Sequence, residues 1–99
     1  MEKDFRYITL FEIYQGLLTK KQKDIFSAYY MLDLSLSEIA DSDGGTRQSV
    51  HDAIKKVKLK LDEYEDNLKI YQKNKEVLDV LSVNGDAVLY DKIKEILGR

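Results

Sequence analysis

The stretch SLSEIADSDGGTRQSVHDAIKK, residues 35–56, places two helix starts on either side of a glycine-rich turn. Ser35 stands three residues before Glu38, which is the spacing of a capping box at the start of a short helix. Thr46 is a second N-cap, because an apolar series with helical spacing begins shortly after it at Val50. A turn of about four residues separates the two segments, so the stretch predicts a helix-turn-helix.

The first turns of the second helix are the part expected to meet nucleic acid. In a helix-turn-helix the first helix braces the second, whose N-terminal side chains reach base edges. Here those side chains are Arg47, Gln48, His51 and Asp52. Arginine suits the acceptors of guanine, and glutamine suits adenine. The hydroxyl of Thr46 and the free N–H groups of the first turn are suited to hold a phosphate.

Four lysines continue the basic character of this helix. Residues 46–60 hold five basic side chains against one acidic side chain, a net charge of +4 inside a chain of net charge −2. Two interpretations stay open: a surface that follows a phosphate backbone, or an outer face that the lysines keep solvated. The predicted nucleic-acid-binding residues are Thr46, Arg47, Gln48, His51, Lys55, Lys56, Lys58 and Lys60.

The turn itself is polar. A helix-turn-helix is held at a fixed angle by an apolar side chain from its turn, and Asp43, Gly44 and Gly45 supply none. The two glycines add backbone freedom, and Asp41 and Asp43 place negative charge beside an approaching phosphate. We therefore expect a loosely held motif in which base-specific readout is impaired.

The helix that begins after Thr46 carries a long heptad. From Val50 its apolar positions follow steps of 4, 3, 4, 3, 4 and 3 residues, which is the a/d pattern of a helical seam. No stop signal precedes the lapse of this pattern at Lys75, so one long helix is predicted. The seam packs either on the N-terminal helices of the same chain or on a second subunit. The predicted dimer seam consists of Ile54, Val57, Leu61, Tyr64, Leu68 and Tyr71.

Two amphipathic segments precede the motif. Residues 5–18 are apolar around most of a helical circumference, which requires cover on more than one side and favours a homodimer. Thr19 and Gln22 have the spacing of a capping box for a helix over residues 20–32.

The C-terminal part is also helical in pattern. Asn84-Gly85 marks a turn, and a last helix is predicted over residues 86–97. The chain contains no proline and shows no internal repeat or linker. These features predict a single all-α domain over residues 1–99: a bundle of five or six helices that contains a helix-turn-helix over residues 20–60 and a long helix after the turn.

Composition excludes several classes of protein. The 99 residues suffice for one small core but not for an additional catalytic domain. Cysteine is absent, which fits a reducing cytoplasm, and no apolar run approaches the roughly 18 residues of a membrane span. We expect a cytoplasmic chain without membrane insertion. His51 stands without a second histidine or a cysteine, so we expect no metal site, no cofactor and no enzymatic activity. The acids of DEYED, residues 62–66, are interpreted as helix surface.

Three motifs together resemble the YlxM family, a group of small bacterial helix-turn-helix proteins encoded beside the signal recognition particle (SRP) genes. They are LF-x-x-YQ-x-LLT-x-KQ at residues 10–22, YY-x-x-D-x-SL-x-EIA at residues 29–40, and RQ-x-V-x-D-x-I-K at residues 47–55. The resemblance implies an all-helical fold similar to region 4 of sigma factors. The family has an aromatic and an aliphatic residue in the turn, where this chain has Asp43 and Gly45.

Two functions are compatible with these observations. The resemblance implies a helix-turn-helix regulatory protein that binds DNA and takes part in the SRP pathway or regulates its components, with SRP RNA or SRP protein as other partners. The acidic net charge, the heptad and the polar turn favour an alternative. In that alternative the chain is a homodimeric protein–protein interaction module of the SRP pathway whose degenerate helix-turn-helix does not read DNA.

Overall fold

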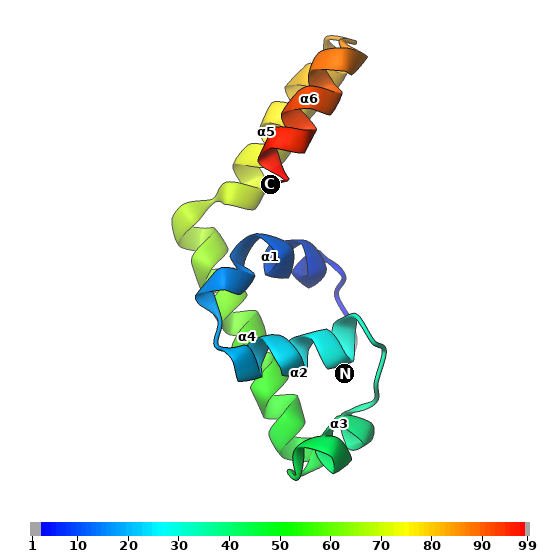
Figure 1. The fold of residues 1–99 in the computed structure, drawn as a ribbon. Coiled ribbons are helices and arrows are strands. Elements are labelled where there is room, and N and C mark those ends of the chain that lie inside the picture. The colour runs from blue at the N-terminus through cyan, green and yellow to red at the C-terminus, as the bar shows by residue number, and fades with distance from the viewer. Residues whose placement is uncertain (1–2, 99) are drawn as a thin grey trace.

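The structure, a computed structural model, describes residues 3–98. These residues form six α-helices and one 3₁₀ helix and contain no strand (Figure 1). This confirms the predicted all-α class, with α3 and α4 as the two helices of the helix-turn-helix. The elements are α1 (Arg6–Tyr14), η1 (Gln15–Leu17), α2 (Lys20–Tyr30), α3 (Leu36–Asp43), α4 (Arg47–Leu68), α5 (Ile70–Val83) and α6 (Ala87–Leu97).

Capping side chains fix where α2, α3 and α4 begin. Thr19, Ser35 and Thr46 are the three N-caps, as the sequence predicts, and each side-chain oxygen accepts the amide N–H three residues later. The side-chain oxygen at that third position in turn accepts the backbone N–H of the N-cap residue, which completes a capping box at all three helices. The helix starts are thus determined locally by the sequence.

A stripe of aliphatic residues on α4 forms the centre of the core. Val50, Ile54, Val57 and Leu61 are at most 2 % exposed. They face α1, α2 and α3, which all pack against α4. Burial of such a side chain contributes about 1.5–3 kcal/mol, so this stripe is the main contact that holds α1–α4 together as one body.

Aromatic rings join α1 to α2. The ring of Phe11 stacks on that of Phe26 with centroids 4.5 Å apart, and Phe26 stacks on Tyr30 at 4.4 Å. Rings in such contact add about 0.5–1.5 kcal/mol beyond their buried area. Other parts of the same chain therefore cover much of the apolar surface of residues 5–18, although Phe5 and Leu17 are exposed.

The heptad seam packs differently along its length. Ile54, Val57 and Leu61 belong to the intramolecular core, and a second subunit would have to displace α1 and α2 to reach them. Tyr64 is half-buried, and its hydroxyl donates to a carbonyl of η1 at 3.3 Å. Leu68 is the position at which the seam reaches the surface, with 46 % of it exposed.

The predicted long helix after the turn is α4, but it ends at Leu68, before the heptad pattern lapses. There α4 ends, Lys69 takes a left-handed φ of 56°, and α5 starts in a new direction. The carboxylate of Glu65 accepts two amide N–H groups from the first turn of α5, at 3.0 and 3.1 Å. A tertiary contact of one side chain, and no glycine or proline, thus ends the helix inside the heptad.

Glu65 is also the exception to the solvated surface expected for residues 62–66. It is 6 % exposed, and it accepts a 2.6 Å hydrogen bond from the hydroxyl of Tyr14. The same hydroxyl accepts the N–H of Ile70 at 3.2 Å. Burial and the hydrogen bond to Glu65 raise the pKa of Tyr14, which keeps it protonated as a donor. This buried node connects α1, α4 and the start of α5.

Helices α5 and α6 form a hairpin that projects from the α1–α4 body along the 51 Å long axis of the molecule (Figure 1). The predicted turn at Asn84-Gly85 is present, and Gly85 has a φ of 72° that suits glycine. Asp86 caps α6 by accepting an amide N–H at 2.9 Å. Neither helix contains a buried residue. Within residues 3–98, no helix has the length and apolarity to cross a bilayer.

Candidate nucleic-acid interface

The turn between α3 and α4 is closed by backbone hydrogen bonds. Gly44 adopts a left-handed φ of 78° and ends α3. The amides of Gly44 and Gly45 both donate to the carbonyl of Ala40, at 2.9 and 3.1 Å, in the pattern that commonly ends helices with glycine. The backbone freedom expected of the glycine pair is therefore used for a defined cap that ends α3.

The N-terminus of α4 is held by a reciprocal pair of side chains. Thr46 accepts the amide of Ser49 at 3.0 Å, and the Ser49 hydroxyl accepts the amide of Thr46 at 2.9 Å. The backbone N–H groups of Arg47 and Gln48, the two residues between Thr46 and Ser49, have no acceptor within residues 3–98. Free amides at the positive end of a helix dipole are the groups that bind phosphate in proteins.

The predicted base-contacting side chains differ in how free they are. Arg47 is exposed, and its guanidinium has no ion pair among the described residues. Gln48 is exposed but donates its amide to the carboxylate of Asp52 at 2.9 Å. His51 is half-buried, with Nδ1 3.5 Å from the same carboxylate. Contact of Gln48 with an adenine would therefore require it to release Asp52.

The four lysines do not form one patch. At 100° per residue, Lys55 and Lys58 share a flank of α4 with Arg47, whereas Lys56 and Lys60 lie on the opposite flank. Neighbouring groups confirm this division. The ammonium of Lys58 lies 5.0 Å from the ring centroid of Tyr7 in α1, and Lys56 lines a shallow hollow at the start of α2.

A hydrogen-bonded cluster fixes α1 beside the Arg47 flank. The hydroxyl of Tyr7 donates to Asp62 at 2.7 Å, and Arg6 contacts the other oxygen of that carboxylate at 3.3 Å. Burial, together with the bond to Asp62, raises the pKa of Tyr7 to about 12. Asp62 therefore positions α1 and lowers the positive charge of this flank toward its C-terminal end.

Sequence reasoning missed Glu65 as a functional anchor, although the sequence does contain a signal for it. Glu65 follows Ile54 by eleven residues and Leu61 by four, spacings that place it on the apolar face of α4. A carboxylate on a buried face requires hydrogen-bond donors. The donors, the hydroxyl of Tyr14 and the amides of α5, become visible only in three dimensions.

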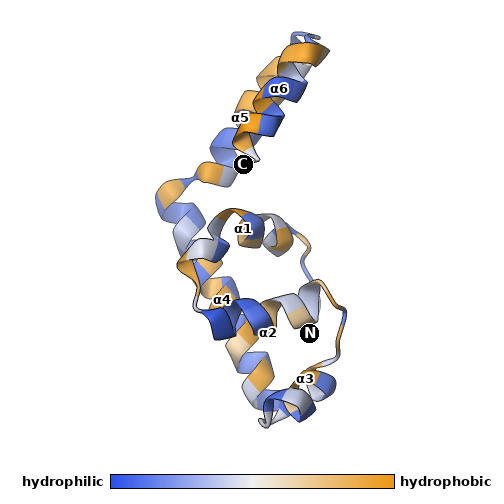
Figure 2. Cartoon of the chain, in the orientation of Figure 1, coloured by the Kyte–Doolittle hydropathy of each residue, from blue (hydrophilic) through white to orange (hydrophobic). Residues whose placement is uncertain are grey.

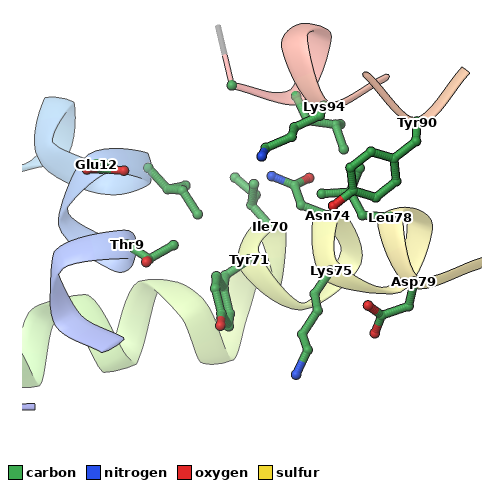
Figure 3. Close-up of a pocket in the computed structure, with 13 residues that line it drawn as sticks. Thr9, Glu12, Ile70, Tyr71, Asn74, Lys75, Leu78, Asp79, Tyr90 and Lys94 are labelled. Atoms are coloured by element: carbon green, nitrogen blue, oxygen red, sulfur yellow. The ribbon is translucent and has the colours of Figure 1, made fainter. Parts of the chain in front are cut away.

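An open cleft of about 600 Å³ lies between α1 and the part of the hairpin next to the body (Figure 3). Ile70, Tyr71 and Leu78 supply apolar lining, and Asn74 of α5 and Lys94 of α6 supply polar lining. Among residues 3–98, no three side chains of His, Cys, Asp or Glu gather closely enough to hold a metal ion. The groups suited to nucleic acid thus lie on the first turns of α4 and not in the cleft.

Comparison with known proteins gives one consistent family. Residues 1–97 match the sequence model of the UPF0122 family, described as "Putative helix-turn-helix protein, YlxM / p13 like". A UPF0122 protein of Ureaplasma urealyticum serovar 10 is 42% identical over 94 residues, which cover 95% of each chain. A UPF0122 protein of Bacillus thuringiensis is 49% identical over 76 residues, 77% of this chain and 69% of the relative. One of Bacillus pumilus is 46% identical over 81 residues, 82% and 74% of the two chains.

Proposed function

Because the chain belongs to the YlxM/p13-like family of helix-turn-helix proteins, we propose that it is a regulatory protein that binds nucleic acid through the first turns of α4. The observation that carries this proposal is the free N-terminus of α4. The exposed Arg47 and two unpartnered amides lie together there, on a helix that α3 braces. Such a helix end offers both a base-contacting cation and a phosphate site.

The basic flank of α4 gives the proposed binding mode. Arg47, Lys55 and Lys58 follow one side of the helix and are placed to track a phosphate backbone, while Thr46 and the free amides hold a phosphate at the helix end. His51 and Gln48 reach bases only after they leave Asp52. We therefore propose that phosphate contacts supply most of the affinity and that base selectivity is modest.

The proposed target is DNA of the genes for SRP components, with SRP RNA as the competing target. The flank comprises three cations in a chain of net charge −2, so few counterions are released on binding. The salt dependence of the association constant then reports the number of contacts between basic side chains and phosphates. The logarithm of the association constant should fall with that of the salt concentration with a slope of about −3 on duplex DNA.

Fluorescence anisotropy with labelled duplexes from those genes and with SRP RNA tests the proposal. We expect Arg47→Ala to weaken binding by about 1–3 kcal/mol and to reduce the selectivity between duplexes. Lys73→Ala, in the first turn of α5 beyond the C-terminal end of α4, serves as the matched control and should leave the affinity unchanged. If neither nucleic acid binds at 20 mM salt, the proposal is wrong.

A second candidate function is a homodimeric interaction module of the SRP pathway that does not read DNA. The contact of Gln48 and His51 with Asp52 supports it, as do Asp41 and Asp43 on the exposed approach to the helix end. Here SRP protein would be the partner. Capture of SRP protein by the wild type and by Arg47→Ala in equal amounts, without a shift of any duplex, would favour this second function.

A further inference from the structure

The joint between α4 and α5, residues 68–70, has the sequence of a continuous helix. It contains no glycine or proline, and the heptad spacing continues across it from Leu68 to Tyr71. Apolar segments lie on both sides of the joint, in α4 and in α5 (Figure 2). A helix bends sharply at proline or glycine, or where a side chain enters its ladder of backbone hydrogen bonds. Only the last of these causes applies to the joint.

The ladder of helical hydrogen bonds is interrupted over three residues only. The backbone N–H of Lys69 donates to the carbonyl of Glu65 at 2.8 Å, and that of Lys73 donates to the carbonyl of Lys69 at 2.9 Å. Both are the bonds of an α-helix, between residues four apart. The backbone N–H groups of residues 70–72, which lie between these bonds, donate to side chains instead. In a straight helix they would donate to the carbonyls of residues 66–68.

Two side chains accept all three of these N–H groups. The hydroxyl of Tyr14 accepts that of Ile70 at 3.2 Å, and the carboxylate of Glu65 accepts those of Tyr71 and Gln72 at 3.0 and 3.1 Å. The hydroxyl and the carboxylate are themselves joined by a 2.6 Å hydrogen bond. One bonded pair of side chains thus replaces the three carbonyls of a straight helix, so the bend leaves none of the three N–H groups without an acceptor.

Opposing contributions act on the bend. Against it, Lys69 is held at a φ of 56°, a left-handed conformation that residues other than glycine seldom adopt. In favour of it, α1 contacts α5, and Tyr71 packs partly buried against the core. A straight helix would relieve Lys69 but would expose Tyr71 and leave buried Glu65 with the Tyr14 hydroxyl alone. A backbone in such a conformation persists only while its surroundings hold it there.

We propose that the joint is a two-state hinge. In its bent form Tyr14 and Glu65 hold residues 70–72, and in its straight form α4 and α5 are one helix over residues 47–83. The bent form predominates, and the straight form is a minor state of the same chain. Because the bend inclines the hairpin toward α1, the straight form carries the hairpin away and opens the cleft between them. The hinge does not rest on nucleic-acid binding by α4.

Substitution of Lys69 tests the hinge, because its side chain is exposed and its φ differs between the two forms. Lys69→Ile should favour the straight form, since a β-branched residue tolerates a left-handed φ least. Lys69→Gly should favour the bent form. The ratio of straight to bent molecules should differ at least about tenfold between the two variants.

Pulsed electron spin resonance measures that ratio. The chain has no cysteine, so Glu12→Cys in α1 and Ser82→Cys near the tip of the hairpin, both exposed, carry the two spin labels. We expect one short distance in the otherwise wild-type chain and in Lys69→Gly. Lys69→Ile should add a second population at a longer distance.

Two controls separate a hinge from local unfolding. Lys73→Ile makes the same change at an exposed position inside α5 with no left-handed φ, so it should keep the single short distance. Labels at Glu76→Cys and Asp91→Cys, one in each helix of the hairpin, should report the same distance with and without Lys69→Ile. The helical circular dichroism of Lys69→Ile should not fall, because the straight form retains both helices. Equal distances in Lys69→Ile and Lys69→Gly, a second population in Lys73→Ile, a changed hairpin distance, or a loss of helical signal would each overturn the proposal.

Discussion

At the scale of single residues, the exposed tip of α4 and the buried Glu65 have opposite electrostatic environments. Arg47 has no partner among residues 3–98, and such a cation remains available to an anion. Glu65 accepts three hydrogen bonds, from the Tyr14 hydroxyl and two amides, which compensate for the cost of its burial. The first arrangement is the one that the proposed function would use, and the second fixes the geometry of the chain.

Substitution of Glu65 should lower the stability of the protein. Glu65→Ala leaves the Tyr14 hydroxyl and two amides without their acceptor, so we expect the free energy of unfolding to fall by about 3 kcal/mol or more. Glu65→Gln retains an acceptor oxygen and should cost less. Urea denaturation followed by circular dichroism measures both. Glu63→Ala, at an exposed neighbour, is the control and should change stability by less than about 0.5 kcal/mol. Equal losses for all three variants would contradict this role of Glu65.

At the scale of elements, local signals were sufficient for the starts of α2, α3 and α4 but not for the end of α4 or the start of α5. The capping boxes at Thr19, Ser35 and Thr46 were predictable because each uses residues three apart. The end of α4 at Lys69 was not, because Glu65 accepts the amides six and seven residues ahead while the hydroxyl of Tyr14, 51 positions away, holds its carboxylate. Which of the predicted base-contacting side chains are free likewise depends on Asp52, which contacts Gln48 and His51. The residue types alone do not predict these contacts.

The α3–α4 turn gives a prediction at this scale. Gly44 ends α3 at a φ of 78°, so Gly44→Ala should destabilise the protein by about 1–2 kcal/mol, even though an added Cβ meets nothing within 4 Å. Gly16→Ala is the matched control, because Gly16 has an equally open surrounding without a left-handed φ. It should be neutral or stabilising by up to about 1 kcal/mol. Thermal unfolding of both variants measures the difference, and equal melting temperatures would show that the turn does not need the left-handed cap.

At the scale of the whole molecule, the chain consists of a body with a core and a hairpin without one. The buried apolar residues all lie between Leu10 and Leu61, whereas α5 and α6 attach through the Glu65 node and the contacts of α1 with α5. The predicted single domain did not distinguish these parts, because the apolar spacing of the hairpin resembles that of core helices. Only the packing reveals that neither α5 nor α6 contains a buried residue.

This division predicts that the body folds without the hairpin. A chain cut after Lys75 keeps the two amides that Glu65 accepts and loses no buried residue. It should unfold cooperatively with a melting temperature only a few degrees lower than that of the full chain. A cut after Asp62 serves as the contrast: it removes Glu65 and leaves Tyr14 buried without its acceptor, so we expect it to lose the transition. Both are measured by circular dichroism melting. If the longer fragment also lacked a transition, the hairpin would supply stability to the body directly, through the cleft residues that the cut removes, among them Leu78, Tyr90 and Leu97.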